Sequence, residues 1–142
     1  MMPMPFHIRD ATAEDEDQVI ALWRICGLVA LHNDPFADFR FAVAGPASTV
    51  LVALADDLIV ASAMVGHDGH RGWLYYVACA PGRRREGLGS SVVAAGEKWL
   101  CARGVAKVQL MVRQTNAAVV PFYEQLGYED MPRVLMSKWL ST

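Results

Sequence analysis

The sequence has no apolar run approaching the roughly 18 residues that a membrane-spanning helix requires. Its first residues, Met1 to Pro5, contain no hydrophobic core of a secretory signal. These two absences predict a soluble, cytoplasmic protein that has no membrane partner.

Cysteine is scarce, and its spacing does not suggest metal ligands. The three cysteines, Cys26, Cys79 and Cys101, are odd in number and form no C-x-x-C pair. Each lies in an apolar stretch of the sequence. Buried, reduced thiols are therefore expected, and neither disulfides nor a bound metal.

Neither sign of charge dominates. There are 13 Lys and Arg against 15 Asp and Glu, so the formal net charge is −2, which argues against a nucleic-acid partner. The 142 residues are 54% hydrophobic and 20% charged. Because no linker or repeat interrupts them, a single folded domain over residues 1–142 is predicted.

The most informative stretch spans residues 81–104. An apolar run over 73–80 leads into three consecutive arginines, 83–85, and then two close glycines, Gly87 and Gly89. Apolar residues follow at helical spacing, namely Leu88, Val92, Ala95 and Trp99. The pattern is strand, turn and helix start. Free backbone N–H groups and partial positive charge make such a helix start an anion-binding site.

Apolar periodicity and turn residues predict the remaining elements. Strands are expected over residues 6–9, 49–55, 58–65, 73–80, 107–113 and 133–139, and helices between 12 and 27, 34 and 45, 88 and 104, and 116 and 126. The helix that joins the strands at 73–80 and 107–113 implies a parallel crossover, whereas the earlier strands should be antiparallel. The predicted fold class is α/β (α+β), with a mixed central sheet and about four flanking helices.

Two common phosphate-binding motifs do not fit the turn. A P-loop requires Lys-Ser or Lys-Thr after its second glycine, but Leu88 and Gly89 follow Gly87. A dinucleotide fingerprint requires a third glycine where Val92 stands, and an acidic residue about twenty positions later, which is also missing. Nucleotide hydrolysis and dinucleotide binding are therefore disfavoured.

A third pattern fits. Arg84-x-x-Gly87-x-Gly89, three residues after Pro81 and opening a helix, resembles the acetyl-CoA signature of the GCN5-related N-acetyltransferase (GNAT) superfamily. One residue departs from it, since the family usually has glycine where this chain has Arg85. A side chain at this position could restrict the turn.

A second motif also resembles the family. Asn116 is followed by Phe122-Tyr123-Glu124 and then by Gly127-Tyr128, as in the family's second signature. The order of predicted elements extends the resemblance over nearly the whole chain. The short segments at residues 33–35 and 66–72 resemble those of a small bacterial subgroup of the family.

The resemblance implies where acetyl-CoA binds. The pyrophosphate would lie on backbone N–H groups from Arg85 to Gly89, and the adjoining parallel strands would splay to admit the pantetheine arm. At least one of the three arginines should face the phosphates. The implied cofactor-binding residues are Val77, Ala78, Cys79, Arg84, Arg85, Glu86, Gly87, Leu88, Gly89, Ser90 and Asn116. Asn116 either binds the arm or only caps its helix.

The resemblance also implies a reaction, in which a primary amine attacks the thioester directly in a ternary complex. Tyr123 occupies the family's acid position, although the same residue could be a core aromatic. The proton acceptor stays open, because the strand at 73–80 lacks the glutamate that many relatives carry there. His67, Asp68, His70 and a water relay are alternatives. The His-x-x-His spacing is better explained by an Asp68-Gly69 turn than by a metal.

The residues around the acceptor are inferred least directly. Implied substrate-binding residues are His32, Asp34, His67, Asp68 and Tyr75. Asp34 precedes Pro35 and could equally be a helix N-cap. The leading hypothesis is an acetyl-CoA-dependent N-acetyltransferase, and the alternative is a non-catalytic acyl-CoA-binding regulatory module. A homodimer is the family's usual state.

Overall fold

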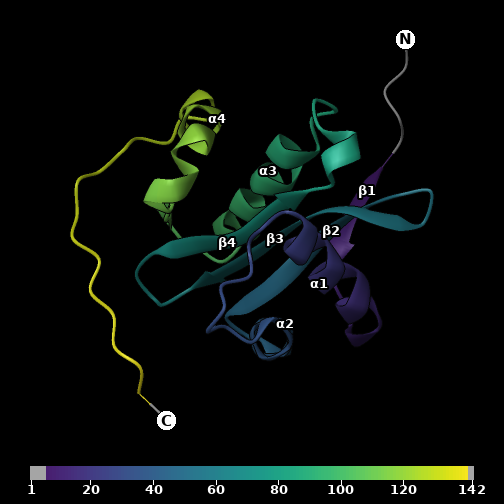
Figure 1. Cartoon of the computed structure of the whole chain (residues 1–142). Helices are drawn as coiled ribbons and strands as arrows, with labels where there is room; N and C mark the ends of the chain where they lie inside the picture. Colours follow the sequence, from purple (N-terminus) through teal and green to yellow (C-terminus); the bar gives the residue numbers. More distant parts are fainter. Residues whose placement is uncertain (1–5, 141–142) are drawn as a thin grey trace. The chain divides into compact units, whose positions relative to one another are not determined.

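The computed structural model describes residues 6–140, and the chain divides into two units between Met111 and Val112. The first unit contains a five-stranded sheet in the order β1-β2-β3-β4-β5; Figure 1 labels β1 to β4. None of the helices within residues 6–140 has both the length and the apolar character needed to cross a membrane.

The strands follow the chain in sequence order. They are β1 (His7–Asp10), β2 (Ser48–Ala55), β3 (Leu58–His67), β4 (Gly72–Cys79) and β5 (Val108–Leu110). Neighbours from β1 to β4 are antiparallel, and β4 pairs with β5 in parallel. The mixed sheet and its parallel crossover therefore confirm the predicted fold class.

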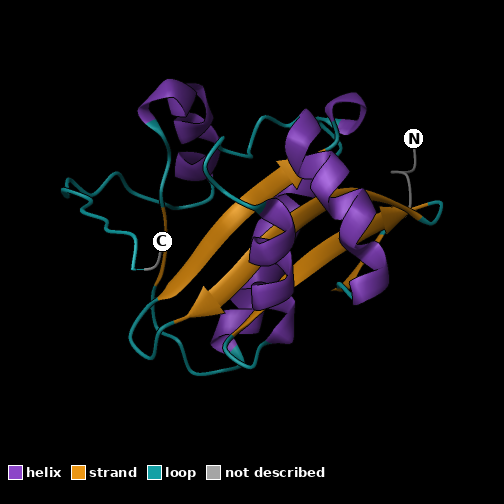
Figure 2. Ribbon diagram, turned by 60° about the horizontal axis from the view of Figure 1, so that its bottom comes forward, coloured by secondary structure: helices purple, strands orange, loops and turns teal. Residues whose placement is uncertain are grey.

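Helices cover both faces of this sheet (Figure 2). The helices of the first unit are α1 (Glu16–Ile25), α2 (Pro35–Ala44) and α3 (Leu88–Cys101). Side chains alternate between the faces along β2. Val50 and Val52 pack in one buried cluster with residues of α1 and α2, whereas Ala53 and Ala55 pack in another with residues of α3.

Local sequence explains several element boundaries. Asp56 and Asp57 both have positive φ, 51° and 62°, as a two-residue hairpin turn between β2 and β3 requires. The carboxylate of Asp34 accepts hydrogen bonds from the backbone N–H groups of Phe36 and Ala37, at 3.0 and 3.2 Å. Asp34 is thus the N-cap of α2, and Pro35 opens the helix.

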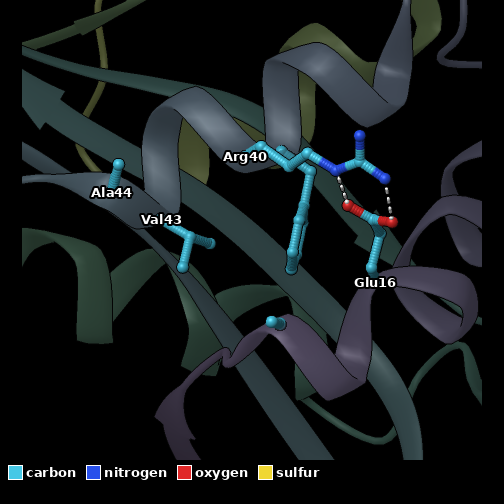
Figure 3. Close-up of a pocket in the computed structure, with 6 residues that line it drawn as sticks. Glu16, Arg40, Val43 and Ala44 are labelled. Carbon is cyan, nitrogen blue, oxygen red and sulfur yellow. Dashed lines mark hydrogen bonds and ion pairs between the residues drawn. The ribbon is translucent and has the colours of Figure 1, made fainter.

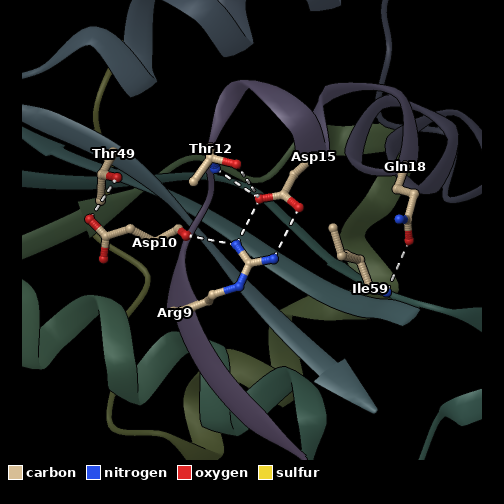
Figure 4. Close-up of polar contacts among 7 residues, drawn as sticks. All are labelled: Arg9, Asp10, Thr12, Asp15, Gln18, Thr49 and Ile59. Carbon is tan, nitrogen blue, oxygen red and sulfur yellow. Dashed lines mark hydrogen bonds and ion pairs between the residues drawn. The ribbon is translucent and has the colours of Figure 1, made fainter. Parts of the chain in front are cut away.

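The carboxylate of Asp15 links β1 to the start of α1 through hydrogen bonds (Figure 4). Asp15, which is buried, accepts hydrogen bonds from the guanidinium of Arg9 at 2.7 and 3.1 Å and from the backbone N–H of Thr12 at 2.8 Å. The hydrogen bonds from Arg9 are the largest cause of a lowered pKa at Asp15. Thr12 is the N-cap of the short 3-10 helix at Ala13–Asp15 that leads into α1.

The second unit contains a 3-10 helix at Gln114–Val119 and α4 (Val120–Gln125). The helix predicted over 116–126 therefore starts later as an α-helix, and Pro121 lies in its first turn.

The strand predicted over 133–139 is wrong, since those residues form no strand. A β-strand needs a neighbour to take its backbone hydrogen bonds, and within residues 6–140 no segment pairs with this one. Its apolar side chains are exposed, including Val134 at 87% and Met136 at 86%.

The cysteine prediction is partly wrong. All three thiols are free, but Cys26 and Cys79 are only half-buried and Cys101 is exposed near the end of α3. Cys101 lies on the solvent face of an amphipathic helix, and the apolar local sequence did not reveal this.

Candidate functional site

The pairing of β4 with β5 ends well before β4 does. The parallel ladder joins Gly72 to Val108 and ends with Leu74 opposite Leu110, while β4 continues to Cys79. The stretch from Tyr75 to Cys79 is thus paired with β3 on one side and not with β5 on the other. Backbone groups on the open side can take hydrogen bonds from a ligand laid along the strand.

The turn after β4 delivers the start of α3. A short 3-10 helix at Pro81–Arg83 is followed by Arg84 in an extended conformation. Gly87 is the N-cap of α3, with φ of 80°. The hydroxyl of Ser90 donates to the carbonyl of Gly87 at 3.1 Å. As at any helix start, the first backbone N–H groups of α3 have no carbonyl partner within the helix and can bind a ligand.

The arginines of the turn differ in their contacts. Arg83 forms an ion pair with Glu86 at 3.6 Å. Arg84 lies near enough to Cys79 to favour its thiolate, yet burial is the larger effect and raises the pKa of Cys79. The Cys79 thiol donates to the carbonyl of Arg83 at 3.6 Å. Cys79 is thus a neutral thiol packed beneath the turn.

A bulge at Tyr76 bends the open part of β4. The register shifts so that Tyr76 and Val77 together oppose one residue of β3, and Tyr76 has a positive φ of 50°. Its ring stacks on Trp23 of α1, with ring centroids 3.8 Å apart. Its hydroxyl donates to the carboxylate of Asp38 on α2 at 2.7 Å. The carbonyl of Tyr76 accepts from the hydroxyl of Ser62, which in turn accepts from Trp23.

The loop between β3 and β4 is organised by Asp68. Its carboxylate accepts from the backbone N–H groups of His70 and Arg71 and from the indole N–H of Trp73, at 2.8 to 3.2 Å. These bonds, led by that from Arg71, lower the pKa of Asp68 to about 2. The Asp68-Gly69 turn is thereby confirmed, and so weak a base is a poor proton acceptor. Across residues 6–140, no three His, Cys, Asp or Glu residues gather as metal ligands.

The other predicted acceptor residues are dispersed. His32 is exposed in the loop between α1 and α2, and the carboxylate of Asp34 caps α2. Tyr75 is 42% exposed, and burial of the rest of the side chain raises its pKa. His67 ends β3, with its ring 6.2 Å from that of Trp99.

The second unit holds the other two predicted site residues. Asn116 is exposed within the 3-10 helix and has non-helical φ and ψ of −117° and 29°. It does not cap α4, whose N-cap is Val119. Tyr123 is half-buried, with edge-to-face contacts to Phe122 and Tyr128 at 4.9 and 5.8 Å between ring centroids. Burial raises the pKa of Tyr123.

A hollow elsewhere in the first unit is lined by none of the predicted site residues (Figure 3). Its volume is about 400 Å³, and its lining residues are Ala13, Glu16, Phe39, Arg40, Val43 and Ala44. At its edge the guanidinium of Arg40 donates twice to the carboxylate of Glu16, at 2.7 and 2.9 Å.

The strand, turn and helix start form the arrangement that the sequence motif implied, and comparison with other proteins tests the resemblance. The model of the Acetyltransferase (GNAT) family matches residues 10–128. The chain belongs to the GNAT acetyltransferase family.

Relatives of this GNAT chain extend over almost its full length. An acetyltransferase from Yersinia pestis (strain Pestoides F) is 38% identical over 133 residues, which are 94% of each protein. An acetyltransferase from Pectobacterium atrosepticum is 39% identical with the same coverage.

Solved structures show the same fold. Aminoglycoside N-acetyltransferase AAC(6')-Iy in complex with CoA superposes with a TM-score of 0.82, at 18% identity and over 96% of each chain. An acetyltransferase from Clostridium acetobutylicum with acetyl-CoA gives 0.78, at 16% identity, over 94% of this chain and 96% of that one.

Arg85, the residue that departs from the family signature, lies in the left-handed region with φ of 71°. This conformation costs a residue with a Cβ roughly 1–2 kcal/mol. Glycine avoids that strain, but it also makes the unfolded chain more flexible, which offsets part of the gain in stability. We expect Arg85→Gly to raise the free energy of unfolding by about 0.5–1 kcal/mol. Arg84→Gly is the matched control, because Arg84 has a φ of −70° and should lose stability. Urea denaturation measures both, and a loss with Arg85→Gly would contradict the assignment.

The contact between Tyr76 and Asp38 was not anticipated from the sequence of this acetyltransferase. A sequence prediction assumes that side chains along residues 73–80 alternate strictly between the two faces of the sheet. A bulge adds one residue to the strand, so each side chain after it lies on the opposite face from the one predicted. The partner lies 38 residues away on another element. No spacing within either segment marks this contact in the sequence.

Proposed function

We propose that this chain is an acetyl-CoA-dependent N-acetyltransferase that moves the acetyl group to a primary amine by direct attack in a ternary complex. One observation carries the proposal: the open stretch of β4, which ends at Cys79, is connected by a single short turn to the Gly87-capped start of α3. The first can bind amide groups of an extended arm, and the second can bind a diphosphate.

Each proposed cofactor contact has a physical basis. The N–H groups from Arg85 to Gly89 suit the pyrophosphate, because Gly87 leaves room for close approach and the dipole of α3 favours negative charge. Arg84 and Arg85 add positive charge at the same turn. The backbone of Val77 to Cys79 pairs with the pantetheine arm, and Asn116 is proposed to bind that arm as well.

The chemistry requires an activated acyl group, which acetyl-CoA supplies when bound. The chain itself positions the amine, accepts its proton and protonates the departing sulfur. We assign the last role to Tyr123, whose raised pKa keeps the phenol protonated at neutral pH. Support for a single domain comes from the family match, which spans both units. A cytoplasmic homodimer without a metal completes the proposal.

Ser90→Glu tests the cofactor site, since it places a carboxylate in the first turn of α3. A negative charge there stabilises the helix but repels a pyrophosphate. We expect the Kd for CoA, measured by titration calorimetry, to rise at least about tenfold, equivalent to roughly 1.4 kcal/mol, without loss of stability. Ala94→Glu is the control, because Ala94 is exposed farther along the same helix. Equal affinity for both variants would place the pyrophosphate elsewhere.

Turnover is measured as thiol release from acetyl-CoA over a panel of aliphatic amines, peptide amines and arylamines. Release with at least one amine is expected. If the wild type binds CoA but releases thiol with none, the chain is the acyl-CoA-binding module and not an enzyme.

A further inference from the structure

Asp38 of α2 is the carboxylate that the side chain of Tyr76 reaches from the bulge in the open part of β4. Tyr76, at the bulge, directs its side chain to the face covered by α1 and α2, where it packs against the buried cluster. Its hydroxyl donates to Asp38 at 2.7 Å, and both side chains are half-buried. The stacking on Trp23 fixes the ring, so the hydrogen bond holds the Asp38 carboxylate in one place.

The position of this pair relative to a thioester follows from the proposed function, on which this inference rests. With the pyrophosphate at Gly87, the arm runs back along β4 from Cys79 toward Tyr75, a rise of roughly 13 Å over four residues. The acyl end is therefore nearest Tyr75 and Tyr76. The Asp38 carboxylate, bonded to Tyr76, stands on the α1 and α2 side of that end.

The charge of Asp38 is not neutralised by the basic residue of its own helix. Arg40 makes two hydrogen bonds to Glu16, at 2.7 and 2.9 Å, and is held there (Figure 3). A carboxylate can accept about four hydrogen bonds, and the bond from Tyr76 uses one. Asp68, the other acidic candidate near β4, already accepts three bonds and is a poor base with a pKa of about 2.

We propose that Asp38, oriented by Tyr76, binds the ammonium group of the acceptor and takes a proton from it, so that the acceptors are aliphatic primary amines that are cationic at neutral pH. The ammonium gives one proton to the carboxylate. The freed nitrogen then bonds to the acetyl carbon while the carbon–sulfur bond breaks. The sulfur keeps the electron pair and takes the proton that Tyr123 supplies, and the new amide loses its second proton to solvent. Asp38 then releases its proton to solvent and Tyr123 regains one, so that the cycle releases one proton in total.

The test compares Asp38→Asn with Asp17→Asn, which removes an exposed carboxylate from α1. Thiol release is measured with the aliphatic and arylamine panels, and CoA affinity by calorimetry. For Asp38→Asn, kcat/KM for aliphatic amines should fall about 100-fold, the lower range for acid–base catalysis. Its Kd for CoA should change less than twofold. Asp38→Glu should recover part of the loss, and Tyr76→Phe, which keeps the carboxylate, should lose about tenfold.

Three results would overturn the proposal. The first is Asp38→Asn turning over like Asp17→Asn while the wild type is active, which leaves the proposed function intact. The second is a loss of CoA affinity as large as the loss of turnover, which marks a purely structural role. The third is a wild-type protein that acetylates only neutral arylamines. A wild-type protein that acetylates no amine at all would contradict both this proposal and the proposed function.

Discussion

Tyr123→Phe is expected to lower kcat about 100-fold or more, while the Kd for CoA stays within about twofold. The substitution removes one hydroxyl and keeps the ring, so the contacts with Phe122 and Tyr128 persist. General acid catalysis contributes typically 10²–10⁴-fold, and a thiolate that leaves without a donor must take its proton from water. Burial raises the pKa of Tyr123, so the phenol stays protonated over the whole neutral range.

The matched control for this prediction is Tyr128→Phe. It removes the same hydroxyl from a neighbouring half-buried tyrosine in the same unit. We expect less than a threefold change in kcat for this variant, with thiol release as the readout for both. Should the two variants retain equal activity, Tyr123 is a packing residue and the acid must be sought elsewhere.

Trp23→Ala is expected to cost about 3–5 kcal/mol of unfolding free energy, as truncation of a buried Trp typically does. Trp23 is fully buried at 0% exposure, stacks on Tyr76 and lies 6.2 Å from Phe39 between ring centroids. Its indole N–H donates to the buried hydroxyl of Ser62 at 2.9 Å. The truncation opens a cavity beneath the bulge and leaves that hydroxyl without its donor.

Urea denaturation followed by circular dichroism measures this loss. Trp23→Phe should recover part of it, because the ring returns but the N–H does not. Trp139→Ala is the control, since Trp139 is 72% exposed and exposed substitutions usually stay within about 0.5 kcal/mol. A loss below about 1 kcal/mol for Trp23→Ala would show that this side chain does not support the bulge.

Interactions between near neighbours explain what could be predicted from the sequence alone. The Asp34 cap, the Asp68-Gly69 turn and the turn at Asp56 and Asp57 each involve residues within a few positions of one another. Such contacts form wherever the segment is placed, so composition and spacing suffice to predict them. The mixed sheet followed for a similar reason, because a helix between two strands favours a parallel crossover.

The start of α3 was also within reach of the sequence. Its glycines, its helical spacing and the preceding apolar run lie in one continuous segment. That segment predicted an anion-binding site on physical grounds, and the family resemblance specified acetyl-CoA. The left-handed conformation of Arg85 was not predictable, since local preference alone would place a non-glycine residue elsewhere.

Only the tertiary structure placed Tyr76 against Asp38 and left residues 133–139 without a strand. Both outcomes depend on partners distant in sequence: a bulge is set by the register between β3 and β4, and a strand exists only where a neighbour can take its hydrogen bonds. Local pattern therefore identified the segment proposed to bind the cofactor. The group proposed to receive the acceptor amine came from long-range packing, which no short stretch of sequence encodes.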